Sequence, residues 1–96
     1  MPGRKKLTAE EVRALLPTAP GWGYIDGRLR SQFQTLNFAN GVTLVNQVAS
    51  IADELNHHPD ILLTYPRVVI DIYTHDIEGV TEMDFELARR ITGLLA

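Results

Sequence analysis

Residues 37–59 read NFANGVTLVNQVASIADELNHHP and predict one long amphipathic helix in the middle of the chain. Asn37 or Asn40 can cap its N-terminus, because an asparagine side chain accepts a hydrogen bond from the free backbone amides of a first helical turn. The helix must end before Pro59, since proline disfavours the helical conformation of the preceding residue. Apolar residues recur at steps of three and four, which predicts a buried stripe. The stripe consists of Phe38, Val42, Val45, Ala49, Ala52 and Leu55.

A β-hairpin is predicted immediately before this helix. Residues 22–25 and 29–36 are short strand-like runs that flank Asp26-Gly27, a dipeptide typical of tight hairpin turns. In the second run, polar side chains alternate with less polar ones. We expect this second strand to lie at an edge of the sheet, because its polar face tolerates solvent while its backbone can pair with another chain. The polar set is Arg30, Gln32 and Gln34.

A second pair of strands is predicted after the helix, over residues 61–65 and 68–74, with a break at Pro66. Side chains alternate strictly along the last strand, so they point to opposite faces of the sheet. One set is apolar and consists of Val68, Ile70 and Ile72. The other is mostly polar and consists of Arg67, Val69, Asp71, Tyr73 and His75.

Both ends of the chain carry the start signals of a helix. Thr8 is followed three residues later by Glu11, and Thr81 by Asp84, so each threonine can open a capping box. Apolar residues flank both boxes at the positions of a hydrophobic staple, and Pro17 ends the first helix. The staple pairs are Leu7 with Val12 and Val80 with Phe85. The stripe of the last helix is Leu87, Ala88, Ile91, Leu94 and Leu95.

These elements follow the order α-β-β-α-β-β-α. Strands joined by short connections pair antiparallel, and amphipathic helices need an apolar face to cover. We therefore expect an α+β fold, a two-layer sandwich in which a four-stranded antiparallel sheet carries three helices on one face. A chain of 96 residues is the length of one domain, so residues 1–96 are predicted to form a single domain.

The composition excludes several classes of protein. The chain has no cysteine, so a disulfide framework, a thiolate metal site and a cysteine nucleophile are ruled out. The net charge of −3 disfavours nucleic-acid binding. The longest apolar runs are far too short for a membrane span or a signal-peptide core. The sequence predicts a small cytoplasmic protein with no direct nucleic-acid or membrane contact.

Three histidines are the main candidates for chemistry. His57 and His58 stand at the end of the central helix, and His75 ends the last strand, where loops can form a cleft. Asp53 precedes His57 by four residues, so we expect both side chains on one helix face. The carboxylate would fix the imidazole and favour its protonated form. His57 is then placed to act as a general acid.

Two other interpretations of the histidines stay open. A histidine near a helix C-terminus often does no more than cap the helix. Three histidines can also form a zinc site. The spacing disfavours zinc, because neighbours at a helix end diverge by about 100° around the axis and the His-Glu-x-x-His motif is absent.

The spacing resembles the signature of the pterin-4a-carbinolamine dehydratase family. The matching residues are Asp53, His57, His58, Pro59, Tyr65, His75 and Asp84, together with their neighbours at 52–56 and the run Thr81-x-x-Asp84-x-x-Leu87-Ala88. The resemblance extends from the first helix to the last, over essentially the whole chain. One departure is Glu78, where many members have glycine or another small residue. Asp84 is interpreted only as a helix cap and is placed outside the site.

The resemblance implies a reaction. Family members eliminate water from the 4a-hydroxytetrahydropterin that aromatic amino-acid hydroxylases leave behind, and the product is quinonoid dihydropterin. By similarity, His57 and His75 act as acid and base. His58 orients the pterin, and Asp53 supports His57. The rest of the pocket wall would come from Pro59, Thr74, Asp76 and Ile77. No cofactor or metal is implied, because the pterin is the substrate and its electrons stay within it.

The resemblance also implies partners. Two subunits would join their sheets edge to edge into a homodimer, which can pair further into a homotetramer. An aromatic amino-acid hydroxylase would be a functional partner. Animal relatives also act as dimerisation cofactors for a transcription factor. The alternative function is therefore a non-catalytic binding module that stabilises or regulates a hydroxylase or a transcription factor.

Overall fold

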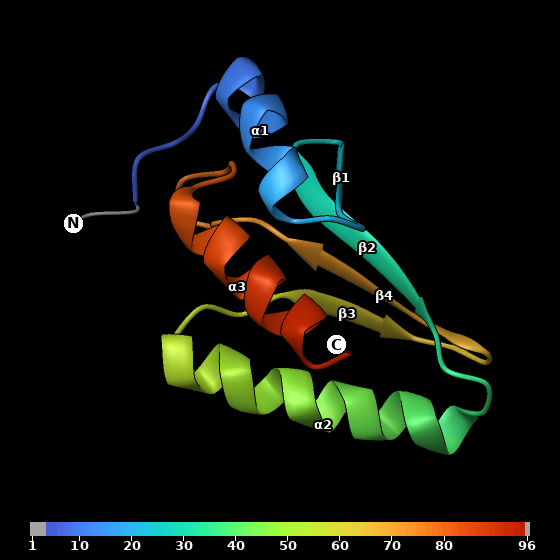
Figure 1. Ribbon diagram of the computed structural model, residues 1–96. Helices are drawn as coiled ribbons and strands as arrows, with labels where there is room; N and C mark the ends of the chain where they lie inside the picture. Colours follow the sequence, from blue (N-terminus) through green and yellow to red (C-terminus); the bar gives the residue numbers. More distant parts are fainter. Residues whose placement is uncertain (1–3, 96) are drawn as a thin grey trace.

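A computed structural model describes residues 4–95 and shows the predicted order of elements (Figure 1). The elements are α1 (Ala9–Leu15), β1 (Gly23–Ile25), β2 (Arg28–Gln34), α2 (Phe38–Leu55), β3 (Asp60–Leu63), β4 (Arg67–Ile72) and α3 (Glu82–Gly93), with a one-turn 3₁₀ helix (Leu16–Thr18) after α1. All strand pairs are antiparallel. The α+β class with a four-stranded antiparallel sheet and three helices is thus confirmed.

The strand order of the sheet is β1-β2-β4-β3, so β1 and β3 are the edge strands. The prediction that the strand after the Asp26-Gly27 turn lies at an edge is wrong, because β2 pairs with β1 on one side and with β4 on the other. β1 has only three residues and reaches no further than Arg30 of β2. Residues 31–34 of β2 therefore have β4 as their only strand partner among the described residues.

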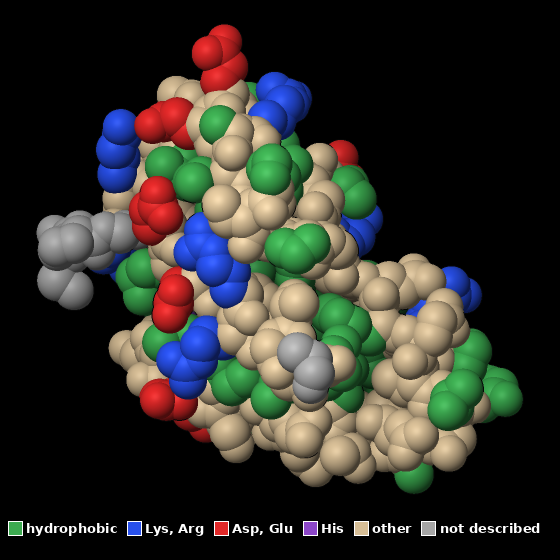
Figure 2. Space-filling view, viewed as in Figure 1, with side chains coloured by type: hydrophobic (Ala, Val, Ile, Leu, Met, Phe, Trp, Pro, Cys, Tyr) green, Lys and Arg blue, Asp and Glu red, His purple; other side chains and the backbone are tan. Residues whose placement is uncertain are grey.

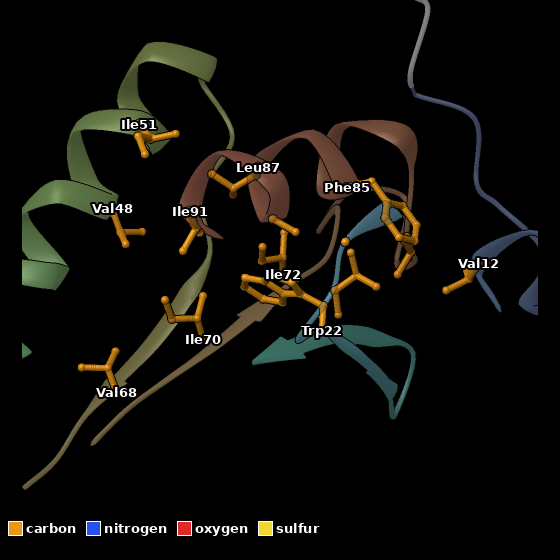
Figure 3. Packing of buried hydrophobic residues seen from close by; sticks show 14 of the residues in the cluster. Val12, Trp22, Val48, Ile51, Val68, Ile70, Ile72, Phe85, Leu87 and Ile91 are labelled. Carbon is orange, nitrogen blue, oxygen red and sulfur yellow. The ribbon is translucent and has the colours of Figure 1, made fainter. Parts of the chain in front are cut away.

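The core lies between one face of the sheet and the helices. Val68, Ile70 and Ile72 of β4 are fully buried, and Leu29 of β2 is buried beside them, as the alternation of side chains predicted. Figure 3 shows these β4 side chains pointing toward residues of α2 and α3. The labelled residues of α2 and α3 are Val48, Ile51, Phe85, Leu87 and Ile91. The opposite face of the sheet carries more exposed, mostly polar side chains and has no helix over it (Figure 1).

Helix α2 begins after the predicted cap Asn37, whose side chain accepts a hydrogen bond from the amide of Asn40. Its buried face differs from the predicted stripe by one residue, or about 100° of helix rotation. The buried residues are Gly41, Leu44, Val48, Ile51 and Ala52. Phe38, Val42 and Ala49 of the predicted stripe are exposed instead. No helix within residues 4–95 is long and apolar enough to cross a membrane.

Hydrophobic side chains also reach solvent where β2 passes into α2, at the right of Figure 2. Leu36, between the two elements, is 82% exposed, and Phe38 at the start of α2 is half exposed. Figure 2 shows charged side chains of both signs over α1 and α3, away from this region. The apolar end of the molecule is thus separated from its most charged part on this face.

Gly41 controls how closely α2 approaches the sheet. A Cβ atom at this position would lie 2.6 Å from Cδ1 of Leu63 and 3.5 Å from Cγ2 of Val68. The first distance is well inside van der Waals contact, so a larger residue would need the helix or Leu63 to move. A glycine was not counted in the apolar stripe, although it marks the face that packs most tightly.

Candidate active site

The C-terminus of α2 sets the position of the adjacent histidines. The helix ends at Leu55, and Asn56 takes the left-handed conformation with φ +51°. Asparagine tolerates this conformation better than most residues and commonly ends a helix. The amide of His57 then donates to the carbonyl of Ala52 over 3.0 Å, which closes the helix end. The chain leaves the helix at Asn56, earlier than the predicted stop at Pro59, so both histidines lie beyond it.

His57 pairs with a carboxylate from another helix. Its Nε2 lies 2.5 Å from Oδ1 of Asp84 in the first turn of α3. The side chains of His57 and Asp84 are 9% and 0% exposed, so the pair is buried. The prediction that Asp53 supports His57 is wrong. The chain leaves the helix before His57, so the two side chains do not have the i,i+4 geometry of a helix.

Asp84 both caps α3 and contacts His57. Its Oδ2 accepts a hydrogen bond from the amide of Thr81 at 2.7 Å, which forms the predicted capping box, and another from the hydroxyl of Thr74 at 2.9 Å. The Thr74 and Thr81 hydroxyls lie 3.0 Å apart. Since Oδ2 is fully engaged, Oδ1 is available to His57. An ionised carboxylate only accepts hydrogen bonds, so it fixes the proton of the imidazole on Nε2.

Asp53 contacts His58 instead. Its Oδ1 lies 3.0 Å from Nε2 of His58, and the side chains of Asp53 and His58 are 79% and 56% exposed. This pair is therefore exposed to solvent, although His58 directly follows His57, whose pair is buried. It leaves His58 accessible to a ligand.

His75 follows β4 in a tight turn. The amide of Thr74 donates to the carbonyl of Gly79 over 2.8 Å, which closes the turn, and Glu78 has φ +54°. Glycine adopts this left-handed conformation without a steric cost, and the turn keeps it here with glutamate. Arg4 pairs with Asp76 in the same turn, and the amide of Leu7 donates to the carbonyl of Val80. The N-terminal segment thus holds the turn.

The three histidines line one pocket of about 190 Å³. Its lining residues are Arg4, Asn56, His57, His58, Tyr73, Thr74, His75 and Asp76. The structure thus brings together five of the predicted substrate-binding residues, whereas Pro59 and Ile77 are not among the lining residues. Glu78 borders a neighbouring hollow with Asp26, Arg28 and Tyr73. Within residues 4–95, no group of three His, Asp or Glu side chains is arranged to hold a metal ion.

A larger groove of about 470 Å³ lies between β2 and α2, far from the histidines in the fold. Its lining contains no titratable side chain. Acid–base chemistry needs groups that exchange protons, so the smaller histidine pocket is the better candidate for an active site.

Three histidines in one pocket of an α+β sandwich, one of them paired with a buried carboxylate, form an arrangement that can give and take protons. The model of the family described as Pterin 4 alpha carbinolamine dehydratase matches residues 5–94. The chain belongs to this family of dehydratases, which are hydro-lyases, as the sequence resemblance predicted.

Relatives with the family's name match along most of their length. A pterin-4-alpha-carbinolamine dehydratase of Sulfolobus acidocaldarius is 43% identical over 86 residues, which cover 90% of this chain and 94% of the relative. One of Rubrobacter xylanophilus is 40% identical over 93 residues, 96% of this chain and 87% of the relative. A crystal structure of a transcriptional coactivator/pterin dehydratase from Brucella melitensis matches with a TM-score of 0.88 and 32% identity, over 96% of this chain and all of that one.

Three residues that line the pocket, Arg4, Asn56 and Tyr73, were not predicted from the sequence, and neither was the contact of Asp84 with His57. Asp84 was interpreted only as a cap, although a capping box uses one carboxylate oxygen and a buried second oxygen needs its own partner. Arg4 and Tyr73 carry no local motif that points to the pocket. Only the fold brings Arg4 to Asp76, 72 residues away.

Proposed function

We propose that this protein eliminates water from 4a-hydroxytetrahydropterin to give quinonoid dihydropterin, with histidines as the acid and the base. The observation that carries the proposal is the buried pair of His57 and Asp84 at a pocket that His58 and His75 also line. The membership of the dehydratase family supports the same reaction.

The chemistry requires two proton transfers. The bond between C4a and the hydroxyl oxygen breaks and a double bond forms between C4a and N5, so the hydroxyl gains a proton and N5 loses one. Two imidazoles in opposite protonation states can perform both transfers, each contributing about 10²–10⁴-fold in rate. We assign these transfers to His57 and His75 and the orientation of the pterin to His58.

The environment of His57 suits this assignment. Its Nε2 is held by Asp84, and its Nδ1 forms no hydrogen bond with residues 4–95. Every buried side-chain nitrogen or oxygen in these residues has a hydrogen-bond partner, so the unpaired Nδ1 cannot be buried. Nδ1 is therefore open to the pocket. A change of protonation at Nδ1 leaves the contact with Asp84 in place, so the imidazole can give or take a proton without moving.

The proposed reaction needs no cofactor or metal, because the electrons stay within the pterin. The substrate would come from an aromatic amino-acid hydroxylase, and the product would be recycled by a reductase. We expect the protein to work in the cytoplasm, where such a pair of enzymes would act.

A direct assay tests the proposed function. The purified protein should accelerate the loss of the absorbance of the 4a-hydroxy adduct, and a metal chelator should leave the rate unchanged. The His57→Ala/His75→Ala variant, with its fold checked by circular dichroism, should fall close to the uncatalysed rate. A wild-type rate equal to the uncatalysed rate would contradict the proposal, and inhibition by the chelator would contradict the metal-free chemistry.

A second candidate function is that of a binding module. The Brucella melitensis structure is described as a coactivator as well as a dehydratase, and α2 presents exposed apolar side chains at Phe38 and Val42. A stoichiometric partner recovered by pulldown through this face, from a protein with no dehydratase activity, would favour the module. Loss of that partner on Val42→Glu would assign the contact to α2.

We also propose that two copies associate through the open part of β2. Within the described part of the chain, residues 31–34 have no strand partner on the side of β1, and residues 32–34 border the 470 Å³ groove together with Leu36 and Leu95. Pairing there would extend the sheet across the two copies. Light scattering at micromolar concentration should give the mass of two or four chains. Leu36→Asp should shift the mass toward one chain, since it places a charge at an apolar contact.

A further inference from the structure

Four side chains from three strands form a closed cycle of contacts behind His75. Asp60 begins β3, Arg28 begins β2, and Tyr73 and His75 follow β4. The sheet brings these three strands side by side in the order β2-β4-β3. The cycle therefore depends on the fold, because only the contact between Tyr73 and His75 is local in the sequence.

Asp60 joins two members of the cycle through its two oxygens. Its Oδ1 lies 3.8 Å from Nε2 of His75, an ion-pair distance that is too long for a direct hydrogen bond. Its Oδ2 lies 3.5 Å from Nη1 of Arg28. Arg28 also reaches Asp71, which stands opposite Asp60 in the strand register, so the guanidinium offsets two facing carboxylates.

Tyr73 closes the cycle through its ring. The ring centroid lies 4.2 Å from that of His75 at an interplanar angle of 53°, and the guanidinium carbon of Arg28 lies 4.2 Å from the same centroid. A guanidinium at this distance from an aromatic ring is in favourable cation–π contact. The two contacts fix the tyrosine ring between the arginine and the histidine in the network.

His75 needs such support because the backbone around it leaves its side chain free. The side chain is 55% exposed and stands in a turn, and holding an exposed side chain in one rotamer costs conformational entropy. A rate enhancement by an acid or base depends on its position, and a displacement of about 1 Å can cost up to 10²-fold in rate. Asp60 does not line the pocket, so it acts on His75 from outside.

We propose that Asp60, supported by Arg28 and Tyr73, is a positioning residue that holds the imidazole of His75 in its working orientation. The carboxylate attracts Nε2 and the tyrosine ring limits rotation, which leaves Nδ1 for the substrate side. This inference rests on the proposed role of His75 in proton transfer. Its structural part, the restraint of the ring by Asp60, stands independently of the reaction.

A double-mutant cycle tests the positioning role. Asp60→Asn should lower kcat about tenfold and change KM less than about twofold, because the interaction serves the reacting geometry and not binding. In the His75→Ala background, the same substitution should have no further effect on kcat. The matched control is Glu54→Gln, which removes another exposed carboxylate, paired with Arg90 between α2 and α3, and should leave kcat unchanged. Equal losses from Asp60→Asn in both backgrounds would overturn the proposal.

A second measurement needs no activity. Nuclear Overhauser contacts between the ring protons of Tyr73 and His75 should be present in the free wild-type protein, lost or weakened in Asp60→Asn and retained in Glu54→Gln. If Asp60→Asn loses the contacts that the wild type shows but the wild type has no dehydratase activity, the proposed function fails while the restraint by Asp60 holds. If the contacts in Asp60→Asn match those of the wild type, the positioning role fails whatever the activity.

Discussion

The adjacent residues His57 and His58 each have a carboxylate partner, yet the two pairs lie in opposite environments. His57 meets Asp84 from another helix, 27 residues away, and the pair is almost wholly buried. His58 meets Asp53, five residues back, and both side chains are largely in solvent. The left-handed Asn56 sends the first histidine inward and leaves the second at the pocket mouth.

The difference shows that the environment, more than the type of partner, distinguishes the two histidines. An exposed ion pair contributes about 0–1 kcal/mol, because water screens the charges and two mobile side chains must be ordered. Removing one partner of a buried pair costs about 3–5 kcal/mol, because the other group stays buried without compensation. The buried pair therefore suits a residue whose orientation and protonation must be fixed, and the exposed pair suits a residue that meets a ligand.

The largest expected effect comes from breaking the buried pair. Asp84→Ala should lower the free energy of unfolding by about 3 kcal/mol, since it leaves His57, Thr74 and the amide of Thr81 without their common acceptor. Dehydratase activity of the remaining folded protein should fall about 100-fold. Chemical denaturation and kcat measure the two effects.

The matched control for Asp84 is Glu11→Ala. Glu11 is the N3 residue of the capping box of α1, as Asp84 is in α3, but the box of α1 is exposed and contacts no histidine. The substitution should cost about 1 kcal/mol and leave kcat unchanged. Equal losses of stability in the two variants would contradict this expectation, because they would show that the buried contacts of Asp84 contribute no stability beyond that of a helix cap.

Exchanging each histidine for alanine should separate the chemical step from binding. His57→Ala should lower kcat about 100-fold, whereas His58→Ala should mainly raise KM, by about tenfold, because it removes a contact made equally in the ground state and the transition state. Steady-state kinetics with the 4a-hydroxy adduct measures both. A fall in kcat for His58→Ala as large as that for His57→Ala would contradict the division of roles.

A third carboxylate, Asp71, is less buried than Asp84 and less exposed than Asp53. Its ion pair can be tested through the pH dependence of stability. Two hydrogen bonds from Arg30, at 2.6 and 2.9 Å, hold the pKa of Asp71 below its usual value. A lowered carboxyl pKa stabilises the folded state above the unfolded pKa of about 3.9, and this contribution is lost as the pH falls through the folded value. Asp71→Asn should therefore be less stable than the wild type at pH 7, and the difference should shrink below about pH 4. Thermal unfolding across this range measures it, and a difference independent of pH would contradict the ion pair.

The smallest effect is expected at Asp53. Asp53→Asn should change the free energy of unfolding by less than about 0.5 kcal/mol, because the pair with His58 is exposed. KM should rise no more than about threefold, since His58 keeps its place without the carboxylate. A loss of kcat comparable to that of His57→Ala would return to Asp53 the role that the sequence first suggested.

Local patterns predicted much of this molecule, and contacts across the fold account for most of what they missed. The alternation along β4 and the two capping boxes depend on spacings of two and three residues, which the sequence shows directly. The pairing of His57 with Asp84 depends on how α3 packs near the end of α2, which no local spacing reveals. The buried face of α2 was missed for another reason, since apolar residues occupy two adjacent stripes and Gly41 decides between them.

Because α2 is a rigid helix, the close approach at Gly41 also affects the position of its other end. The helix has 18 residues and is about 27 Å long, with the glycine near one end and the histidines just past the other. A residue that pushed the near end away from Leu63 would tilt the helix about its middle, and a tilt of about 8° would move the far end by about 2 Å, more than a hydrogen bond tolerates. The absence of a side chain at Gly41 thus keeps the histidine pocket at the far end of the helix in alignment.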